Sequence, residues 1–536
     1  MYFKKISIIS LLVLTFVIAT FNARVYAETQ VSGTISSDTT WTIDKSPYIV
    51  TSSIYVQHSS TGTALLTIEA GVEVRFEQTA SLVIGWDRRG ALYAKGTEDK
   101  PIIFTGNTSH EYEGSWGGIQ FTSRTITQLT HMENCHIEFG GYGLAANIVC
   151  DIANVPIVNC VIKKSSGYPI KVLANGLKIS NLTYIDNKIQ ATLLSGSISE
   201  DTTWTNRGDE GTYAVTSSIY VQHGGSDVAT LTIEPGAIIL FDLNTGLNIG
   251  WDRQGALNAK GTESKPIIFR SSAIEQYPGS WIGIQFTDKT IDTLSIMQYC
   301  VVEYAGYASN SSVVITNAKP TIINSIIKLS FNNGIYISGA GSNGLLIKCN
   351  NILNNKTAIR VKSTEPAITN NNIYNNSDYA IYNESSIINI DATENWWGDQ
   401  YPSSETNKIS DNVIYEPMLQ AKSNCIVFID PDPPCELNDS DNDGVDDSID
   451  KCPNTIQGSA VYSNGCLAQD IYDEKLELTQ QINQLNEQIQ NMYTKTQMEN
   501  MVQDILEWGD CNNDGKITLQ EIVEKLMIIS GIISKK

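Results

Sequence analysis

The sequence predicts an all-β solenoid that is followed by a short C-terminal segment of acidic and helical character. Three observations predict it: long stretches of the chain recur, a shorter period of strands and turns lies within the repeats, and the composition changes abruptly after residue 422. A chain of 536 residues is too long for one compact core, and a repeat architecture removes that restriction.

Long stretches of the first half recur 165 residues further along the chain. The stretch IGWDRRGAL at 84–92 returns as IGWDRQGAL at 249–257. Three more pairs share this offset: TSSIYVQH at 51 and 216, KPIIF at 100 and 265, and GSWGGIQF at 114 with GSWIGIQF at 279. The repetition indicates a tandem duplication.

A second, shorter period is visible towards the end of the repeats. NNILNNKTAI begins at 350 and NNIYNNSDYAI at 371, which is 21 residues later. Short β-branched runs alternate with Gly, Asn and Asp turns, and no helical periodicity occurs between residues 30 and 420. Units of this kind bury their apolar positions by stacking, so the pattern predicts a solenoid with seven or eight coils in each duplicated unit.

Several of these stretches resemble a known class of proteins. LTIEPGAIILF, GALNAKGTESKPIIF, SWIGIQF and CVVEYAGY are similar to the right-handed parallel β-helix modules of bacterial exported proteins, which have the pectin-lyase-like fold. NNNIYNNSDYAIYN and the following ATENWWG resemble the asparagine-rich coils and closing segment of the same class. The resemblance covers residues 33–420 and implies a right-handed parallel β-helix.

These patterns divide the chain into seven segments. The expected order is a signal peptide (1–27), a first β-helix unit (28–194), a second unit (195–345), asparagine-rich terminal coils with a cap (346–422), a calcium-binding repeat (423–468), a coiled coil (469–497) and an EF-hand (498–536).

The N-terminus has the features of a secretory signal. Lys4 and Lys5 precede an apolar run that is too short to span a membrane, and Ala27 offers a cleavage site. We therefore expect a secreted or cell-surface protein, and no later stretch predicts a transmembrane segment. The net charge of −22 argues against nucleic acid and anionic membranes as partners.

The repeated Trp-Asp-Arg motif allows a structural and a functional interpretation. In the first, Trp86 and Trp251 cover a turn and add to stability, while the adjacent Asp and Arg side chains pair across neighbouring coils. In the second, the motif is a carbohydrate-stacking platform or a lyase-type site of Arg and carboxylates. The structural interpretation is favoured, so no residue is assigned as catalytic or as binding an organic cofactor.

The remaining His and Cys residues of the repeats are also given structural roles. We expect surface turns for all four histidines: His58 and His223 are a matched repeat pair, and His131 and His136 have no cysteine or carboxylate at a metal-ligand spacing. Cys135 and Cys300 form a repeat pair on apolar stretches, and this predicts core packing for them.

An acidic segment follows the repeats and predicts a first Ca²⁺ site. Alternating carboxylates before Gly444 let a short loop wrap oxygen atoms around a hard cation. The segment resembles a thrombospondin type 3 repeat, and its expected ligands are Asp439, Asp441, Asp443, the Val445 carbonyl, Asp447 and Asp450. A disulfide between Cys452 and Cys466 is expected, with Cys425 and Cys435 as a weaker second pair.

The C-terminus predicts a short coiled coil and a second Ca²⁺ site. Apolar residues recur every seven positions between 471 and 492, which fits either an oligomerising stalk or a single helix lying on its neighbour. DCNNDGKITLQE at 510–521 fills the ligand positions of an EF-hand loop. The expected ligands are Asp510, Asn512, Asp514, the Lys516 carbonyl, Thr518 and Glu521. EF-hands usually pair, so a homo-oligomer through the coiled coil and the EF-hand is expected.

Two functions from different classes remain open. The favoured one is a non-catalytic, calcium-binding surface protein whose β-helix contacts an extracellular glycan or surface protein. The alternative is a polysaccharide lyase or glycoside hydrolase, because the resembling lyases collect acidic and basic residues on one face from several coils. Three or more such residues converging in a groove would favour the enzyme.

Overall fold

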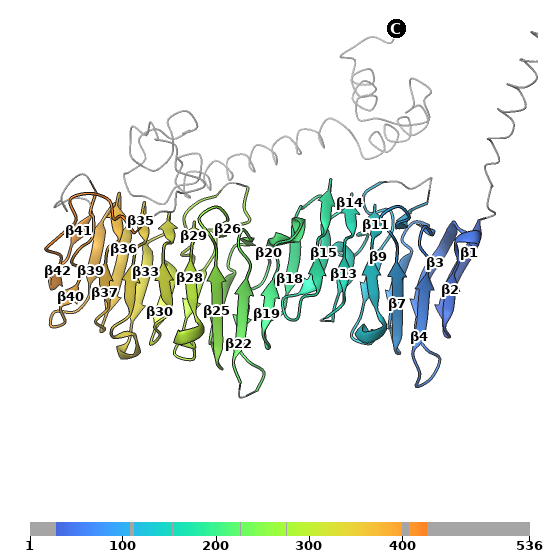
Figure 1. Ribbon diagram of the computed structural model, residues 1–536, viewed down its shortest axis with the longest axis horizontal. Coiled ribbons are helices and arrows are strands. Elements are labelled where there is room, and N and C mark those ends of the chain that lie inside the picture. The colour runs from blue at the N-terminus through green and yellow to red at the C-terminus, as the bar shows by residue number, and fades with distance from the viewer. Residues whose placement is uncertain are drawn as a thin grey trace, which may run out of the picture.

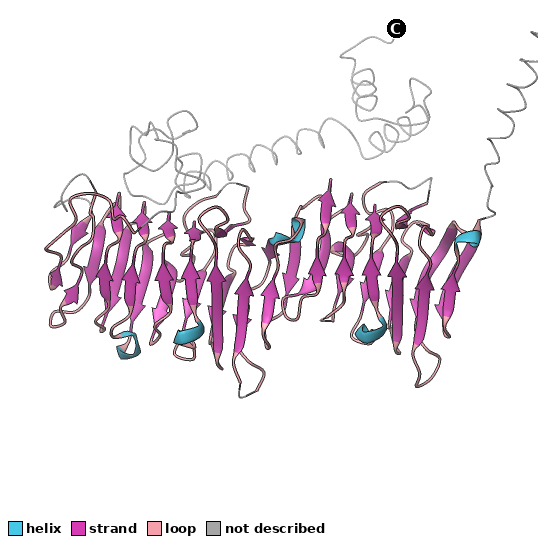
Figure 2. Ribbon diagram, in the orientation of Figure 1, coloured by secondary structure: helices cyan, strands magenta, loops and turns pink. Residues whose placement is uncertain are grey.

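The computed structural model describes residues 28–107, 112–152, 154–225, 227–274, 276–398 and 407–425. Within them the chain forms one elongated parallel β-solenoid of about 14 coils, of the right-handed type (Figure 1). Strands dominate and the helices are single 3₁₀ turns at the edges (Figure 2). The predicted solenoid is therefore confirmed for this part of the chain.

Each coil contributes up to three strands, which we call its first, second and third strands. The chain opens with two long strands, β1 (Thr29–Ile35) and β3 (Tyr48–Val56), which span the first and second positions. The other first strands are β5 (Glu73–Phe76), β8 (Ile102–Gly106), β11 (Cys135–Glu138), β14 (Val161–Lys163), β17 (Thr183–Ile185), β20 (Thr212–Val215), β23 (Ile238–Phe241), β26 (Ile267–Ser271), β29 (Cys300–Glu303), β32 (Ile326–Lys328), β35 (Asn351–Leu353) and β38 (Asn372–Tyr374).

The second and third strands follow in the same order along the axis. The second strands are β6 (Ser81–Ile84), β9 (Gly118–Phe121), β12 (Ala146–Cys150), β15 (Tyr168–Leu173), β18 (Thr192–Ser195), β21 (Ile219–Val221), β24 (Gly246–Ile249), β27 (Gly283–Phe286), β30 (Ser311–Thr316), β33 (Asn333–Ser338), β36 (Thr357–Lys362), β39 (Tyr379–Asn383) and β41 (Lys408–Ile409). The third strands are β2 (Thr39–Trp41), β4 (Ala64–Ile68), β7 (Gly90–Lys95), β10 (His131–Glu133), β13 (Ile157–Val158), β16 (Ile179–Ser180), β19 (Thr202–Trp204), β22 (Ala229–Ile233), β25 (Gly255–Lys260), β28 (Ile296–Gln298), β31 (Thr321–Ile323), β34 (Leu346–Lys348), β37 (Ala367–Thr369), β40 (Ile390–Asp391) and β42 (Val413–Ile414). The 3₁₀ turns are η1 (Ile43–Lys45), η2 (Thr127–Leu129), η3 (Asp209–Gly211), η4 (Asp292–Leu294) and η5 (Ala340–Ser342).

The core runs along the axis and is made by every second strand residue. In β4 the residues alternate between buried and half-buried, as the two-residue period of a strand requires. Aromatic rings stack inside at equivalent places in the two units: Phe76 lies 4.0 Å from Trp116, and Phe241 lies 4.3 Å from Trp281, measured between ring centroids. The duplication therefore repeats the core as well as the surface.

The number of coils in each duplicated unit is smaller than predicted. Six steps of strand pairing lead from β6 to its counterpart β24, through β9, β12, β15, β18 and β21, so the expectation of seven or eight is wrong. A spacing of 21 residues occurs near the end, where Asn351 pairs with Asn372, and again at the junction of the units, where Thr192 pairs with Tyr213, but it does not hold throughout. Longer connections, such as that from Gly106 to Gly118, lengthen the earlier coils.

The two units join without a break in the sheet. The strand β18 pairs with β15 of the first unit on one side and with β20 of the second unit on the other. Beside it, the fully buried carboxylate of Glu210 accepts backbone N–H groups from Asn181, Leu182 and Arg207 at 3.0, 3.0 and 3.2 Å. One carboxylate therefore satisfies backbone groups on both sides of the junction.

A ladder of buried side chains connects the turns between third and first strands. The backbone N–H of Ser325 donates to Oδ1 of Asn350, that of Asn350 to Asn371, and that of Asn371 to Asn395, at 3.0, 3.0 and 2.9 Å. Cys300 begins this row, because its N–H donates to Oγ of Ser325 at 3.2 Å. Each coil thus hydrogen-bonds to the next one through side chains as well as through strands.

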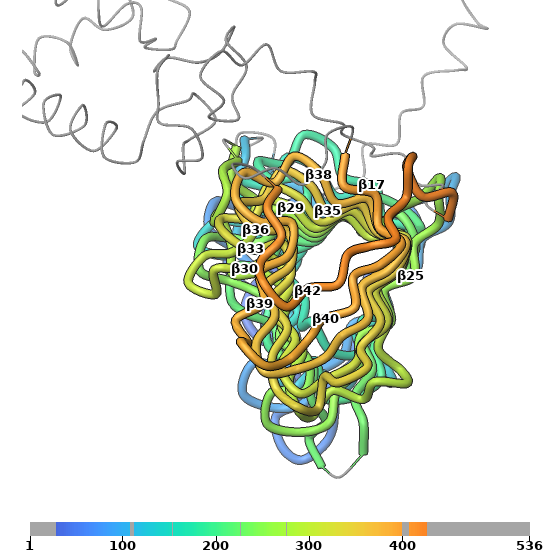
Figure 3. The backbone as a smooth tube through the Cα atoms, turned by 90° about the vertical axis from the view of Figure 1, so that its left-hand side faces the viewer, coloured from blue at the N-terminus to red at the C-terminus, as the bar shows by residue number. Residues whose placement is uncertain are grey.

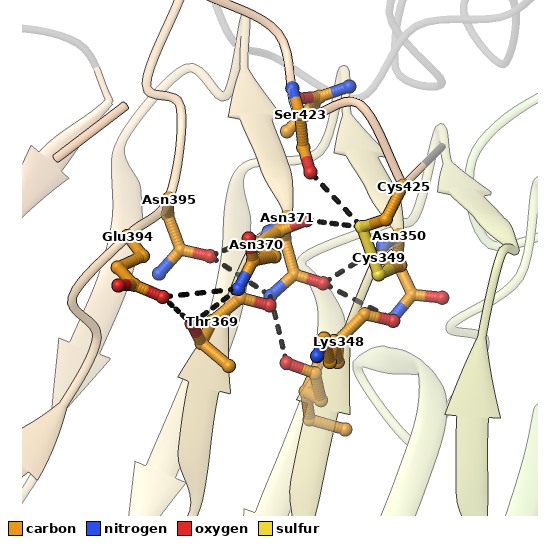
Figure 4. The surroundings of a disulfide bond; sticks show 12 residues. Lys348, Cys349, Asn350, Thr369, Asn370, Asn371, Glu394, Asn395, Ser423 and Cys425 are labelled. Atoms are coloured by element: carbon orange, nitrogen blue, oxygen red, sulfur yellow. Dashed lines mark hydrogen bonds between the residues drawn. A yellow bond between two sulfur atoms is a disulfide. The ribbon is translucent and has the colours of Figure 1, made fainter. Parts of the chain in front are cut away.

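A disulfide closes the C-terminal end of the solenoid. Cys425 bonds to Cys349, 76 residues earlier and in the turn between β34 and β35 (Figure 4). Lys422, in the same closing segment, lies over the rings of Tyr374 and Trp396 at 5.4 and 5.3 Å. The expected pairing of Cys425 with Cys435 is therefore wrong, because the fold brings Cys349 within bonding distance instead.

Candidate functional site: two matched aromatic platforms

Two equivalent loops project from the edge between second and third strands. The first follows β3 and lies beside the turn between β6 and β7, and the second follows β21 and lies beside the turn between β24 and β25. Both protrude in the same direction in the side view and in the view along the axis (Figures 1 and 3). At about 4.8 Å per strand spacing, six coil steps separate them by about 29 Å.

The first loop carries an exposed aromatic pair. Trp86 is 58% exposed, and its ring lies 6.0 Å from that of Tyr55 on the preceding coil. The backbone N–H of Asp87 donates to Oε1 of Gln57 at 2.7 Å, and the Arg88 guanidinium donates to the carbonyl of Ser59. These bonds fix the turn, in which Asp87 and Arg88 directly follow Trp86.

The second loop repeats this arrangement. Trp251 is 48% exposed and lies 5.9 Å from Tyr220 between ring centroids. The N–H of Asp252 donates to Oε1 of Gln222 at 2.8 Å, and Arg253 donates to the carbonyl of Gly224. We call Tyr55 with Trp86, and Tyr220 with Trp251, the two aromatic platforms.

Glycine residues explain why the Trp side chains point outwards. Gly85 and Gly250 have φ of +76° and +71°, and a Cβ at either would lie within 2.6 Å of the backbone of the next coil. A Cβ at Gly90 or Gly255 would lie 1.8 or 1.9 Å from a carbonyl oxygen. The backbone of the turn therefore lies directly against the backbone of the adjacent coils. This close contact leaves no space beneath the turn for an indole ring.

The structural interpretation of the motif is corrected by this geometry. Trp86 and Trp251, expected to cover a turn, do so only in part, because about half of each side chain faces solvent. Asp87 and Arg88 do not pair across coils either: their closest charged atoms are 4.0 Å apart within the same turn. The sequence could not reveal this, since a turn residue follows no inward and outward alternation.

The histidines divide into two groups. His58 and His223 lie in surface turns as expected, and each accepts backbone N–H groups at Nδ1. The expectation is wrong for His131 and His136, which lie on β10 and β11. His131 Nε2 lies 2.8 Å from a carboxylate oxygen of Glu133, whereas burial, followed by nearby Lys163, lowers the pKa of His136.

Three charged residues of the second unit do converge, but not in a groove. Glu303 lies 3.3 Å from Lys328 and 3.9 Å from Arg270. The side chains of Glu303 and Lys328 are only 4% and 2% exposed. The first unit has a matching pair, with Glu138 3.2 Å from Lys163. Since Glu303 and Lys328 are covered and only Arg270 is partly exposed, at 30%, this cluster fits a buried ion pair better than a site for a polymeric substrate.

The cysteines of the repeats are core residues, as predicted. Cys135 and Cys300 are fully buried free thiols, and their Sγ atoms donate to backbone carbonyls of Ala94 and Ala259 at 3.5 and 3.4 Å. Burial raises the pKa of the Cys300 thiol to about 12, so the reactive thiolate is scarce at neutral pH.

The predicted metal sites lie outside the described residues. This applies to both ligand sets, the one from Asp439 to Asp450 and the one from Asp510 to Glu521, and to the pair Cys452 and Cys466. Within the part of the chain that the structure describes, no group of three or more His, Cys, Asp or Glu side chains is placed to hold a metal ion. Its helices include none that is long and apolar enough to cross a bilayer.

The chain was compared with known families, curated proteins and solved structures. The family described as a pectate-lyase-like β-helix domain matches residues 33–147 and 196–293. No curated protein and no solved structure matches the chain. The two matched segments begin at equivalent glycines, Gly33 within β1 and Gly196 directly after β18, and each segment includes one aromatic platform. The chain thus carries a pectate-lyase-like β-helix domain in each of its two duplicated units.

Proposed function

We propose that this protein is an exported or cell-surface protein that binds extracellular glycans through its two aromatic platforms and does not cleave them. The observation that supports this most directly is the repetition of an exposed Trp and Tyr pair, with amide, carboxylate and guanidinium groups beside it, on one edge of the solenoid. Large exposed aromatic rings mark contact surfaces when they are held rigidly.

The chemistry of the platforms suits a sugar better than a flat apolar partner. A sugar ring offers C–H groups to an aromatic face and hydroxyl groups to the surrounding polar side chains. Asp87 and Arg88 supply an acceptor and several donors next to Trp86, and Asp252 and Arg253 do so next to Trp251. Two platforms about 29 Å apart can contact the same extended polysaccharide, which increases the overall affinity.

The glycan proposal can be tested with substitutions on two different edges. Trp86→Ala and Trp251→Ala should each weaken binding to a responsive polysaccharide about tenfold, which corresponds to about 1.4 kcal/mol, and the double variant should lose more than either. Binding is measured by calorimetry across a panel of neutral and acidic polysaccharides. Tyr142→Ala and Tyr307→Ala are matched controls, because these residues are also repeated and are 53% and 40% exposed.

The enzyme alternative gives a different result in the same experiment. A lyase would release unsaturated sugars, and a hydrolase would release reducing ends, from one of the polysaccharides. Such release by the wild-type protein, lost on Glu303→Gln but not on Trp86→Ala, would assign turnover to the buried cluster. Equal loss of binding in the tyrosine controls would instead contradict the platform assignment.

Calcium binding by the C-terminal segment is a second part of the proposal. The two ligand sets from Asp439 to Asp450 and from Asp510 to Glu521 offer enough oxygen atoms for Ca²⁺, and extracellular modules bind it at about 0.1–1 mM. Chelation should increase protease cleavage between residues 430 and 536 and spare residues 33–420. Asp443→Ala should abolish one site and Glu521→Ala the other, as counted by calorimetry. No Ca²⁺ uptake at millimolar ion would contradict both assignments.

A further inference from the structure

The outer face of the first strands carries an apolar patch in the second unit, and the described chain ends beside it. We propose that residues 426–429, the apolar run Ile-Val-Phe-Ile that directly follows Cys425, dock on this patch in the same molecule. The patch, which we call the lateral patch, consists of outward side chains of β26, β29, β32 and β35: Ile268, Val301, Ile326 and Leu353. This inference does not depend on the glycan proposal.

The lateral patch is buried although it lies on the outside of the strands. Val302 and Ile327 belong to the core, so the adjacent Val301 and Ile326 point outwards. Val301 and Ile326 are nevertheless each only 1% exposed. Apolar side chains on an outer face reach such burial when a further segment packs on them.

The first unit shows how far the coils alone bury this face. His136 and Val161, which are equivalent to Val301 and Ile326, are half-buried. The register is the same in both units, because His136 lies opposite Val161 and Val301 lies opposite Ile326. The additional burial in the second unit therefore indicates a covering segment that the first unit lacks.

The closing segment runs towards the lateral patch. Lys422 lies over the ring of Tyr374 on β38, and this ring packs against the patch. Three residues later, Cys425 is bonded to Cys349 in the turn before β35 (Figure 4). The described chain thus passes from β38 to β35, and its continuation in the same direction leads to β32, β29 and β26.

The length of the apolar run fits the length of the patch. Three steps of strand pairing lead from β35 to β26, through β32 and β29, which is about 14 Å at about 4.8 Å for each step. An extended chain covers about 3.3–3.6 Å for each residue, so residues 426–429 span about 13–14 Å. The run can therefore follow the patch from one end to the other.

The charges beside the lateral patch match the residues that follow the run. Arg270 and Lys328 lie on the same face as the patch, with Glu303 between them at 3.9 and 3.3 Å. Two cations and one carboxylate leave an excess of positive charge there. Asp430 and Asp432 come directly after the apolar run and supply the opposite charge.

The proposal is tested on a matched pair of native lysines in the whole chain. Lys328 is 2% exposed, whereas the equivalent Lys163 of the first unit is 30% exposed. An amine-reactive reagent, read out by peptide mass spectrometry, should modify Lys328 much more slowly than Lys163. Alternate residues of an extended run face the surface, so Phe428→Asp and the double variant Val427→Asp/Ile429→Asp test its two sides. At least one variant should raise the rate at Lys328 about tenfold or more and leave Lys163 unchanged, because the charge opposes docking.

Two results would overturn the proposal. One is unchanged protection of Lys328 in both variants of the run, which would assign the cover to another part of the chain. The other is protection that disappears when the wild-type protein is diluted, which would mean that a second copy supplies the cover. Ile387→Asp adds the same charge at an isoleucine that is 88% exposed, and this control should leave both lysine rates unchanged. Unfolding curves that match the wild type exclude misfolding as the cause of a faster reaction.

Discussion

The repeats contain two pairs of equivalent tryptophans, and one pair is buried whereas the other is exposed because their backbone positions differ. Trp116 and Trp281 are fully buried and stack on phenylalanines inside the solenoid, and each donates its Nε1–H to a backbone carbonyl. Trp86 and Trp251 stand on glycine-bounded turns and face solvent. The same residue type therefore stabilises the fold at one place and is available for contact at the other.

Truncation of these residues should separate the two roles. Trp116→Ala should lower the free energy of unfolding by about 3–5 kcal/mol, because it leaves a cavity in the core. Trp86→Ala should change it by no more than about 0.5 kcal/mol, since the exposed ring loses little packing. Denaturant unfolding measures both. A cost for Trp86→Ala as large as that for Trp116→Ala would show that the platform is a structural element.

At the scale of the element, each coil is held by its strands and by the turn residues between them. The sequence predicted the strands well, because β-branched runs and turn residues alternate so regularly. It could not predict the pairing of Cys349 with Cys425, because that contact depends on how three coils stack. It also misjudged the coil length, because the regular period near residue 350 does not apply to coils with long connections.

The asparagine ladder offers a test at this scale. Asn371→Ala should lower the free energy of unfolding by at least about 1–3 kcal/mol, because the buried N–H of Asn350 loses its acceptor. Asn371→Ser should cost less, since Ser325 already fills a position of the same ladder and its hydroxyl donates to a backbone carbonyl at 3.0 Å. Thermal and denaturant unfolding give the order. Equal costs for Ala and Ser would contradict the hydrogen-bonding role.

The whole molecule is a linear stack in which each coil contacts mainly its neighbours. Its stability is then a sum of local terms, and cooperative unfolding depends on every interface along the axis. The junction of the two units is the place where the register of the sheet changes, as β18 links a second strand to a first strand. Glu210 is buried at this junction and connects both sides.

Removal of that carboxylate should uncouple the two units. Glu210→Ala leaves the buried N–H of Leu182 and the partly buried N–H of Asn181 without their acceptor, so the interface should weaken by about 1–3 kcal/mol from the buried group alone. Calorimetry should then resolve two transitions where the wild type shows one. Glu200→Ala, at an exposed acid of the same region, is the control. A single transition in both variants would refute the role of Glu210.

The disulfide between Cys349 and Cys425 also decides how the molecule responds to mechanical load. If the chain is held through the residues that follow Cys425, tension passes from Cys425 directly to the turn at Cys349. Residues 350–424, which form the last coils, then carry no force. Once the bond is reduced, the same tension enters through the closing segment and peels those coils one after another. When the chain is pulled from its C-terminus, residues 350–424 should therefore unfold at low force only under reducing conditions. The oxidised disulfide protects the last coils of the solenoid from unfolding under tension.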